Sequence, residues 1–169
     1  MLDKPVWKLE PRGEFSAKSA WDYARRRRDP SNTYMNIWIK GLPFKVSFFM
    51  WKVWKNKLPL DDFFKRLGYL MASKCWCCVL PQEETMTHLF FTSHAARKVW
   101  NYFLTVAGIN VDRLTFHQAT VRCWTLQTVP RLKPIIQAVP SIVVWELWKR
   151  RNGYKYGNPA SINRVIYQI

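Results

Sequence analysis

The sequence predicts a mostly α-helical fold: a small helical domain around a Cys-x-x-Cys…His turn, followed by a basic helical extension. Apolar residues recur at the helical period in several segments, and Ser, Pro and Gly stand at the ends of those segments. Of the 169 residues, 49% are hydrophobic, which is enough apolar material to form a core. Cys75, Cys78 and His88 have the spacing of a metal-binding turn.

The first predicted helix covers residues 16–28. Ser16 is a suitable N-cap, and four residues follow it on one helical face: Ala17, Ala20, Trp21 and Ala24. Pro30 disfavours helical backbone at the residue before it, so we expect the helix to end by Asp29. Its last residues are four consecutive arginines, which complement the helix dipole and could equally contact phosphates: Arg25, Arg26, Arg27 and Arg28.

The clearest predicted helix covers residues 44–57. An apolar stripe at helical spacing runs along it: Val46, Phe49, Met50, Val53 and Trp54. Phe48 and Trp51 widen this stripe, so we expect burial on more than one side. Most of the aromatic rings are therefore expected to pack in the core rather than stack on bases.

Two further helices are predicted before residue 109. Asp61 is expected to cap a short helix that ends ahead of Gly68. A longer helix is expected over about residues 84–105, with acidic residues 83–84 in its first turn and Gly108 closing it.

The remaining segment to residue 169 has less regular patterning. Residues 109–140 contain three prolines and only weak periodicity, and a last helix is expected over residues 141–152, closed by Gly153. We also expect the chain to be truncated, because it stops directly after an apolar piece. The expected division is a lead-in (1–14), a helical domain (15–108), an irregular linker (109–140) and a basic helical extension (141–169).

The charge of the chain is strongly one-sided. There are 27 Lys and Arg against 11 Asp and Glu, a net charge of +16, and the excess flanks a nearly neutral segment at residues 75–112. A compact protein with this charge repels itself, and a polyanionic partner such as RNA or DNA relieves the repulsion. Besides the four arginines of the first helix, a second candidate phosphate-binding cluster ends the last helix: Lys149, Arg150 and Arg151.

The cysteines are too close together for a disulfide framework, because three of the four lie within residues 75–78. Two thiolates three residues apart can bind one Zn²⁺, and His88 can supply a third ligand, as in a zinc knuckle. A structural zinc site needs a fourth ligand. His94 and Cys77 are the candidates from the residues alone.

Short motifs follow one another in a specific order: FSAKSAW (15–21), IW (37–38), LPFKVSFFMW (42–51), LP (58–59), RLG (66–68), CWCC (75–78), EE (83–84), HLFF (88–91) and VW (99–100). This order closely resembles the reverse-transcriptase zinc-binding domain of plant non-LTR (LINE-type) retrotransposon-derived proteins. The segment WELWKRRN (145–152) also looks like the segment that follows this domain. The resemblance implies a Zn²⁺ cofactor held by Cys75, Cys78 and His88. The fourth family cysteine falls at Ser93, whose neutral hydroxyl is a poor zinc ligand, so we predict weak zinc binding.

The sequence favours a non-catalytic role. Polymerase, ribonuclease H and nicking chemistry need clustered carboxylates for paired metal ions, and residues 113–169 contain only Glu146. We expect a nucleic-acid-binding module of a retroelement-derived protein that contacts RNA or DNA backbone, with no membrane association and a nuclear, intracellular location. The alternative is a protein-interaction module or a structural remnant without selected activity.

Overall fold

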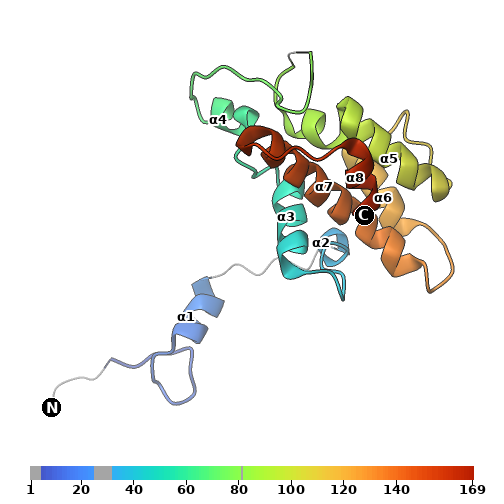
Figure 1. Ribbon diagram of the computed structural model, residues 1–169. Helices are drawn as coiled ribbons and strands as arrows, with labels where there is room; N and C mark the ends of the chain where they lie inside the picture. Colours follow the sequence, from blue (N-terminus) through green and yellow to red (C-terminus); the bar gives the residue numbers. More distant parts are fainter. Residues whose placement is uncertain (1–4, 25–31, 81) are drawn as a thin grey trace. The chain divides into compact units, whose positions relative to one another are not determined.

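The computed structural model describes residues 5–24, 32–80 and 82–169, and all regular structure in these ranges is helical (Figure 1). The prediction of a mostly α-helical fold is therefore confirmed. The chain divides into two compact units, residues 1–31 and 32–169.

The smaller unit contains helix α1 (Ala17–Ala24) and the turn before it. The predicted N-cap is confirmed, because the backbone N–H of Ser19 donates to Ser16 Oγ at 3.0 Å. The indole N–H of Trp7 donates to Ser19 Oγ at 2.7 Å, which ties the turn to the helix. No residue of α1 is buried. Residues 25–28, and with them the predicted end of this helix, lie outside the described residues.

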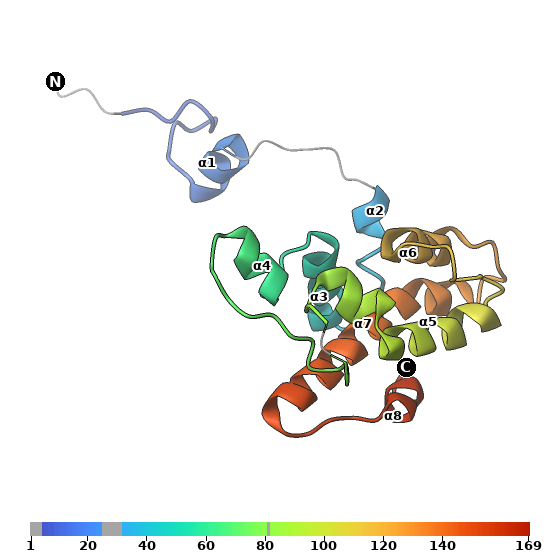
Figure 2. The same ribbon diagram turned by 90° about the horizontal axis from the view of Figure 1, so that it is seen from above.

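The larger unit packs its helices around one long central helix, α7 (Lys133–Tyr156), as Figures 1 and 2 show. Helices α3, α5, α6 and α8 and the π-helical turn η1 all contact α7 or α5. Besides α7, the elements of this unit are α2 (Asn32–Met35), α3 (Phe44–Trp54), α4 (Asp61–Arg66), η1 (His88–Thr92), α5 (His94–Val106), α6 (Phe116–Thr125) and α8 (Ile162–Tyr167).

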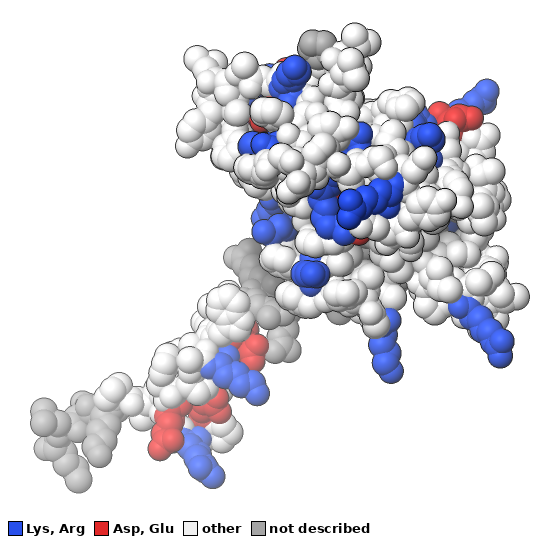
Figure 3. Space-filling view, in the orientation of Figure 1, with Lys and Arg blue, Asp and Glu red and all other residues white. Residues whose placement is uncertain are grey.

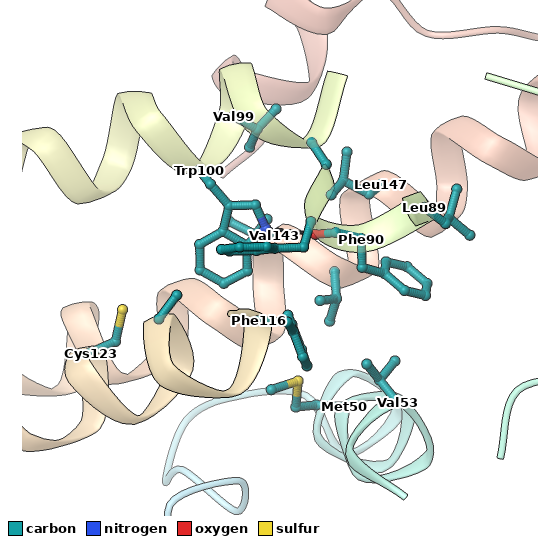
Figure 4. Packing of buried hydrophobic residues seen from close by; sticks show 14 of the residues in the cluster. Met50, Val53, Leu89, Phe90, Val99, Trp100, Phe116, Cys123, Val143 and Leu147 are labelled. Atoms are coloured by element: carbon teal, nitrogen blue, oxygen red, sulfur yellow. Dashed lines mark hydrogen bonds between the residues drawn. The ribbon is translucent and has the colours of Figure 1, made fainter. Parts of the chain in front are cut away.

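The core lies where α3, η1, α5, α6 and α7 meet (Figure 4). The indole N–H of Trp100 donates to the backbone carbonyl of Phe90 at 2.7 Å, and both residues are buried, so the one polar atom of this indole is satisfied. Phe116 of α6 packs edge to face on Trp100, with ring centroids 6.1 Å apart. Helix α6 is thus part of the core rather than an appendage.

The helix expected over residues 84–105 is interrupted at Ser93. The backbone there is extended (φ −62°, ψ 153°), and its buried side chain accepts a hydrogen bond from the N–H of Ala96. Ser93 therefore ends η1 and caps α5. The apolar pattern continues across the interruption, which is why periodicity alone predicted one helix.

The expectation of irregular structure over residues 109–140 was wrong. Helix α6 occupies residues 116–125 and starts with a capping box, in which Thr115 and Gln118 each bond the other's backbone N–H. Helix α7 starts at Lys133 and continues through Pro140. The helix also passes Gly153, where we expected it to end, and closes at Gly157 with a left-handed backbone (φ 102°).

Other predicted helix ends agree with the structure. Helix α3 covers most of the predicted 44–57 segment, and Gly68 and Gly108 follow helix ends with φ values of 90° and 71°. Asp61 is the first residue of α4 rather than its cap, a position that Leu60 takes without a side-chain hydrogen bond.

Candidate metal centre

Three of the four cysteines, Cys75, Cys77 and Cys78, lie in a loop whose two sides are joined by hydrogen bonds. The N–H of Cys75 donates to the carbonyl of Gln82 at 2.7 Å, and the N–H of Glu84 donates to Ser73 Oγ at 2.9 Å. A turn at residues 76–77 reverses the chain between the two outer cysteines. Cys75 and Cys78 are thereby held at the two ends of one tight turn.

His88, the first residue of η1, completes a three-residue cluster with this turn. Ligand atoms of Cys75, Cys78 and His88 all lie within 4.8 Å of one another, and Cys78 Sγ is 3.2 Å from His88 Nε2. The His88 backbone N–H donates to Thr85 Oγ1 at 3.0 Å, which fixes the start of the turn that carries the imidazole. Three of the four predicted ligands are brought together.

The thiols of the cluster differ in acidity. A hydrogen bond from the Cys77 thiol lowers the pKa of Cys75 to about 5, although burial opposes this shift. Burial raises the pKa of Cys78 to about 11, and the positive charge of Arg150 only partly offsets it. These shifts favour the thiolate at Cys75 over the thiolate at Cys78, and the thiolate is the form of cysteine that binds metals.

The residues present fit Zn²⁺. Two sulfurs and one imidazole nitrogen are a typical zinc donor set, with zinc–sulfur bonds of about 2.3 Å and zinc–nitrogen bonds of about 2.0 Å. Such bonds place tetrahedral ligands roughly 3.5–3.8 Å apart, so ligand atoms within 4.8 Å need only small movements. Bound zinc would link the cysteine loop to η1.

The fourth position is not filled by a predicted ligand. His94 is exposed on the first residue of α5 and lies outside the cluster, and Cys77 hydrogen-bonds to Cys75 instead of joining the three ligands. Ser93, which takes the place of the family cysteine, is buried and engaged as the α5 cap.

A buried ion pair fixes the cysteine loop to α7. Arg151 Nε donates to Glu84 Oε1 at 2.9 Å and Arg151 Nη2 donates to Glu84 Oε2, a bidentate geometry. Both residues are buried. Sequence reasoning assigned Glu84 to the first turn of a helix and missed this role. Since the partners are 67 residues apart, no local pattern reports the contact.

The second predicted phosphate-binding cluster is largely buried. Arg150 is 6% exposed and Arg151 is 4% exposed, because the last turns of α7 pack beneath the cysteine loop. Arg150 Nη2 donates to the hydroxyl of Tyr154 at 3.1 Å. The prediction that Arg150 and Arg151 contact phosphates was therefore wrong. Lys149 is exposed and pairs with Glu146 at 2.6 Å.

A helical unit built around a Cys₂His cluster defines the class of small zinc-knuckle-like domains. Residues 15–100 match the family described as zinc-binding in reverse transcriptase, and this match covers half of the chain. The chain belongs to this family, as the sequence resemblance implied. Searches of curated proteins and of solved structures gave no match.

The family assignment and the cluster agree on the cofactor. The matched residues include all three clustered ligands, so a zinc-binding family and a metal-binding geometry coincide on the same side chains. None of the helices in the described ranges combines the length and the apolar character needed to cross a membrane.

Proposed function

We propose that this chain is a non-catalytic module that holds the backbone of RNA or DNA through exposed Lys and Arg side chains. It would do so within a retroelement-derived protein, of the plant LINE type that the sequence resembles. The family ties the chain to reverse transcriptases, which act on nucleic acid, and the net charge of +16 suits a polyanionic partner.

The surface charge of the larger unit carries this proposal. Within its described residues, Glu83 and Asp112 are the only exposed acidic side chains, while exposed Lys and Arg occur on most elements. Figure 3 shows Lys and Arg at several separate positions on one face, with a group near the centre of this unit. Such a distribution supports contacts to the phosphate backbone at several points, without sequence readout.

The arrangement of carboxylates supports a non-catalytic role. Glu84 and Glu146 are buried beside Arg151 and Lys149, and each forms an ion pair there. In the part of the chain that the structure describes, the one group suited to hold a metal ion consists of Cys and His ligands. Paired divalent ions for nucleic-acid chemistry would need carboxylates instead.

Salt dependence tests the proposal. The full chain is titrated into labelled single-stranded RNA, and anisotropy is followed at several salt concentrations between about 50 and 200 mM. We expect log Kd to change linearly and steeply with log salt, because phosphate contacts release counterions. An affinity that barely changes with salt would contradict the mechanism, as would the absence of binding.

The four arginines at residues 25–28 provide a sharper test. They lie outside the described residues, so their role stays a prediction. Replacing all four by Gln should reduce the salt slope by about 3, since each contact to a single strand contributes roughly 0.7. Replacing all four by Lys is the matched control and should keep the slope. A Gln variant with an unchanged slope would exclude this cluster from the binding surface.

A further inference from the structure

The outward face of α3 and the turn before it carry a row of aromatic rings. Trp38, Phe44, Phe48 and Trp51 are stacked in succession, with centroid distances of 5.6, 5.8 and 5.6 Å and interplanar angles of 28°, 10° and 15°. We call these four residues the aromatic ladder. At such distances the rings do not lie in full face-to-face contact, so they do not close off one another's faces completely.

The ladder lies opposite the buried face of its own helix. With about 3.6 residues per turn, positions 44, 48 and 51 share one side of α3, and positions 46, 50 and 53 share the other. The latter three are buried in the core. Phe44 is 71% exposed, Trp38 is 44% exposed and Phe48 is 38% exposed, while Trp51 is partly buried against the core. The expectation that most rings of this helix pack in the core is therefore wrong for the outward face.

The chain segment that carries the ladder contains positive charge and no negative charge. Residues 32–60 contain five lysines and no Asp or Glu. The ammonium of Lys52 lies 4.9 Å from the centre of the Phe48 ring, and Lys40 and Lys45 are exposed close by in the chain. A contiguous exposed aromatic patch bordered by charge of one sign indicates a binding surface for an anionic partner.

We infer that the aromatic ladder binds single-stranded RNA or DNA, with unpaired bases stacking on its rings and the adjacent lysines contacting phosphates. This inference rests on the proposed function and adds the form of nucleic acid that is preferred. Stacking requires a free base face, which a single strand offers and a duplex does not. A protein partner would be expected to meet charges of both signs, and the chain segment that carries the ladder has charge of one sign only.

The test compares the Phe44→Leu/Phe48→Leu variant with the unaltered full chain. Leucine keeps the outward face apolar but removes the rings. Binding is measured by anisotropy with a labelled 20-nucleotide single strand and with the duplex of the same sequence at one salt concentration. We expect the single-strand affinity to fall at least tenfold, since one base–aromatic stack contributes about that much or more. The duplex affinity should change less than about twofold, because the phosphate contacts are untouched.

Tyr102→Leu is the matched control. Tyr102 is an exposed aromatic residue of α5 outside the ladder, and its replacement should leave both affinities unchanged. A second measurement needs no variant: RNA that carries 5-iodouracil is photocrosslinked to the unaltered chain, and the crosslinked peptides are identified by mass spectrometry. We expect crosslinks within residues 38–51.

The outcomes separate this inference from the proposed function. If the unaltered chain binds no nucleic acid, the proposed function fails. If it binds with strong salt dependence and the double variant binds equally well, or loses single-strand and duplex affinity alike, only the ladder inference is overturned. Crosslinks confined to other segments would also overturn it, as would a double variant that changes self-association in sedimentation and not RNA binding.

Discussion

Arg151 belongs to a run of basic residues, but it stabilises the fold by pairing with Glu84 and does not lie at the surface where it could bind a ligand. Burial works against its charge, but the hydrogen bonds and the negative charge of Glu84 outweigh burial and raise its pKa. Both partners are withdrawn from water, so neither can be lost alone without leaving a buried charge. Lys149, two residues earlier, is itself exposed, although its partner Glu146 is buried.

We therefore predict that Arg151→Met lowers the free energy of unfolding by about 3–5 kcal/mol, because Glu84 is left buried without its counter-charge. The double variant Glu84→Leu/Arg151→Met should recover most of this loss. Urea denaturation of the three proteins measures both effects. A loss below about 1 kcal/mol for the single variant would show that the pair contributes no more than an exposed ion pair.

Ser93 links helix capping to metal binding. We predict that Ser93→Cys tightens Zn²⁺ binding, because a thiolate replaces a hydroxyl at the fourth family position. The same change should lower the stability of the metal-free protein by about 1 kcal/mol, since Ser93 accepts a hydrogen bond as the α5 cap. Calorimetric zinc titration and urea denaturation without metal measure the two effects. Equal, submicromolar zinc affinity in both proteins would contradict the first prediction.

The sequence predicted the roles of individual residues correctly where their partners are near them in the chain. Cys75 and Cys78 are joined by one turn and His88 opens the next element, so their spacing alone indicates a cluster. The prediction failed for Arg150 and Arg151, whose burial depends on a loop about seventy residues earlier. Positive charge in a sequence does not tell whether a neighbouring element covers it.

At the scale of elements, α7 and the segment after it depend on one close approach. A Cβ atom added at Gly153 would lie 2.3 Å from the backbone oxygen of Asn158. The N–H of Asn158 donates to the carbonyl of Gly153 at 2.8 Å, so the chain folds back directly onto this helix position. Gly153 is needed for backbone proximity, and it does not end the helix.

We predict that Gly153→Ala destabilises the protein by about 2 kcal/mol, because the added methyl group displaces the returning backbone. Hydrogen exchange should show faster exchange in α8, which follows the displaced segment, than in α3. Lys155→Ala, an exposed change on the same helix, serves as the control and should have little effect. Unchanged exchange in α8 of the Gly153 variant would refute the packing argument.

Predicted helix boundaries were correct where a capping or helix-breaking residue stood at the end of a clear apolar pattern. Helix α3 starts directly after Pro43, and its buried stripe matches the predicted one. Helix α6 was missed although Thr115 and Gln118 have the spacing of a capping box, because its apolar pattern is weak. Pro140 misled the prediction of α7: a proline usually stops a helix, but here the helix continues through it in the buried centre of the unit.

At the scale of the whole molecule, the larger unit separates a structural interior from a charged exterior. Its cysteine loop, η1 and α7 are joined by the Cys₂His cluster and by the Glu84–Arg151 pair. The aromatic ladder lies on α3 and the turn before it, outside the cysteine loop and η1. The metal is thus expected to stabilise the unit, while the surface inferred to bind bases lies on another element.

Removal of zinc should consequently weaken the fold before it alters any contact to RNA. We predict that a strong chelator lowers the melting temperature and speeds hydrogen exchange in the cysteine loop, residues 73–84, since a structural metal contributes folding energy. Circular dichroism and hydrogen-exchange mass spectrometry follow the two effects. Equal protection of this loop from hydrogen exchange with and without chelator would mean that the metal ion does not stabilise the loop.

Calorimetric titration of the reduced full chain with Zn²⁺ measures whether Cys75, Cys78 and His88 form a metal centre. We expect saturation at about one ion per chain and loss of binding in Cys75→Ser/Cys78→Ser, because thiolates are the principal ligands. No binding by the unaltered chain, or undiminished binding by the double variant, would contradict this expectation.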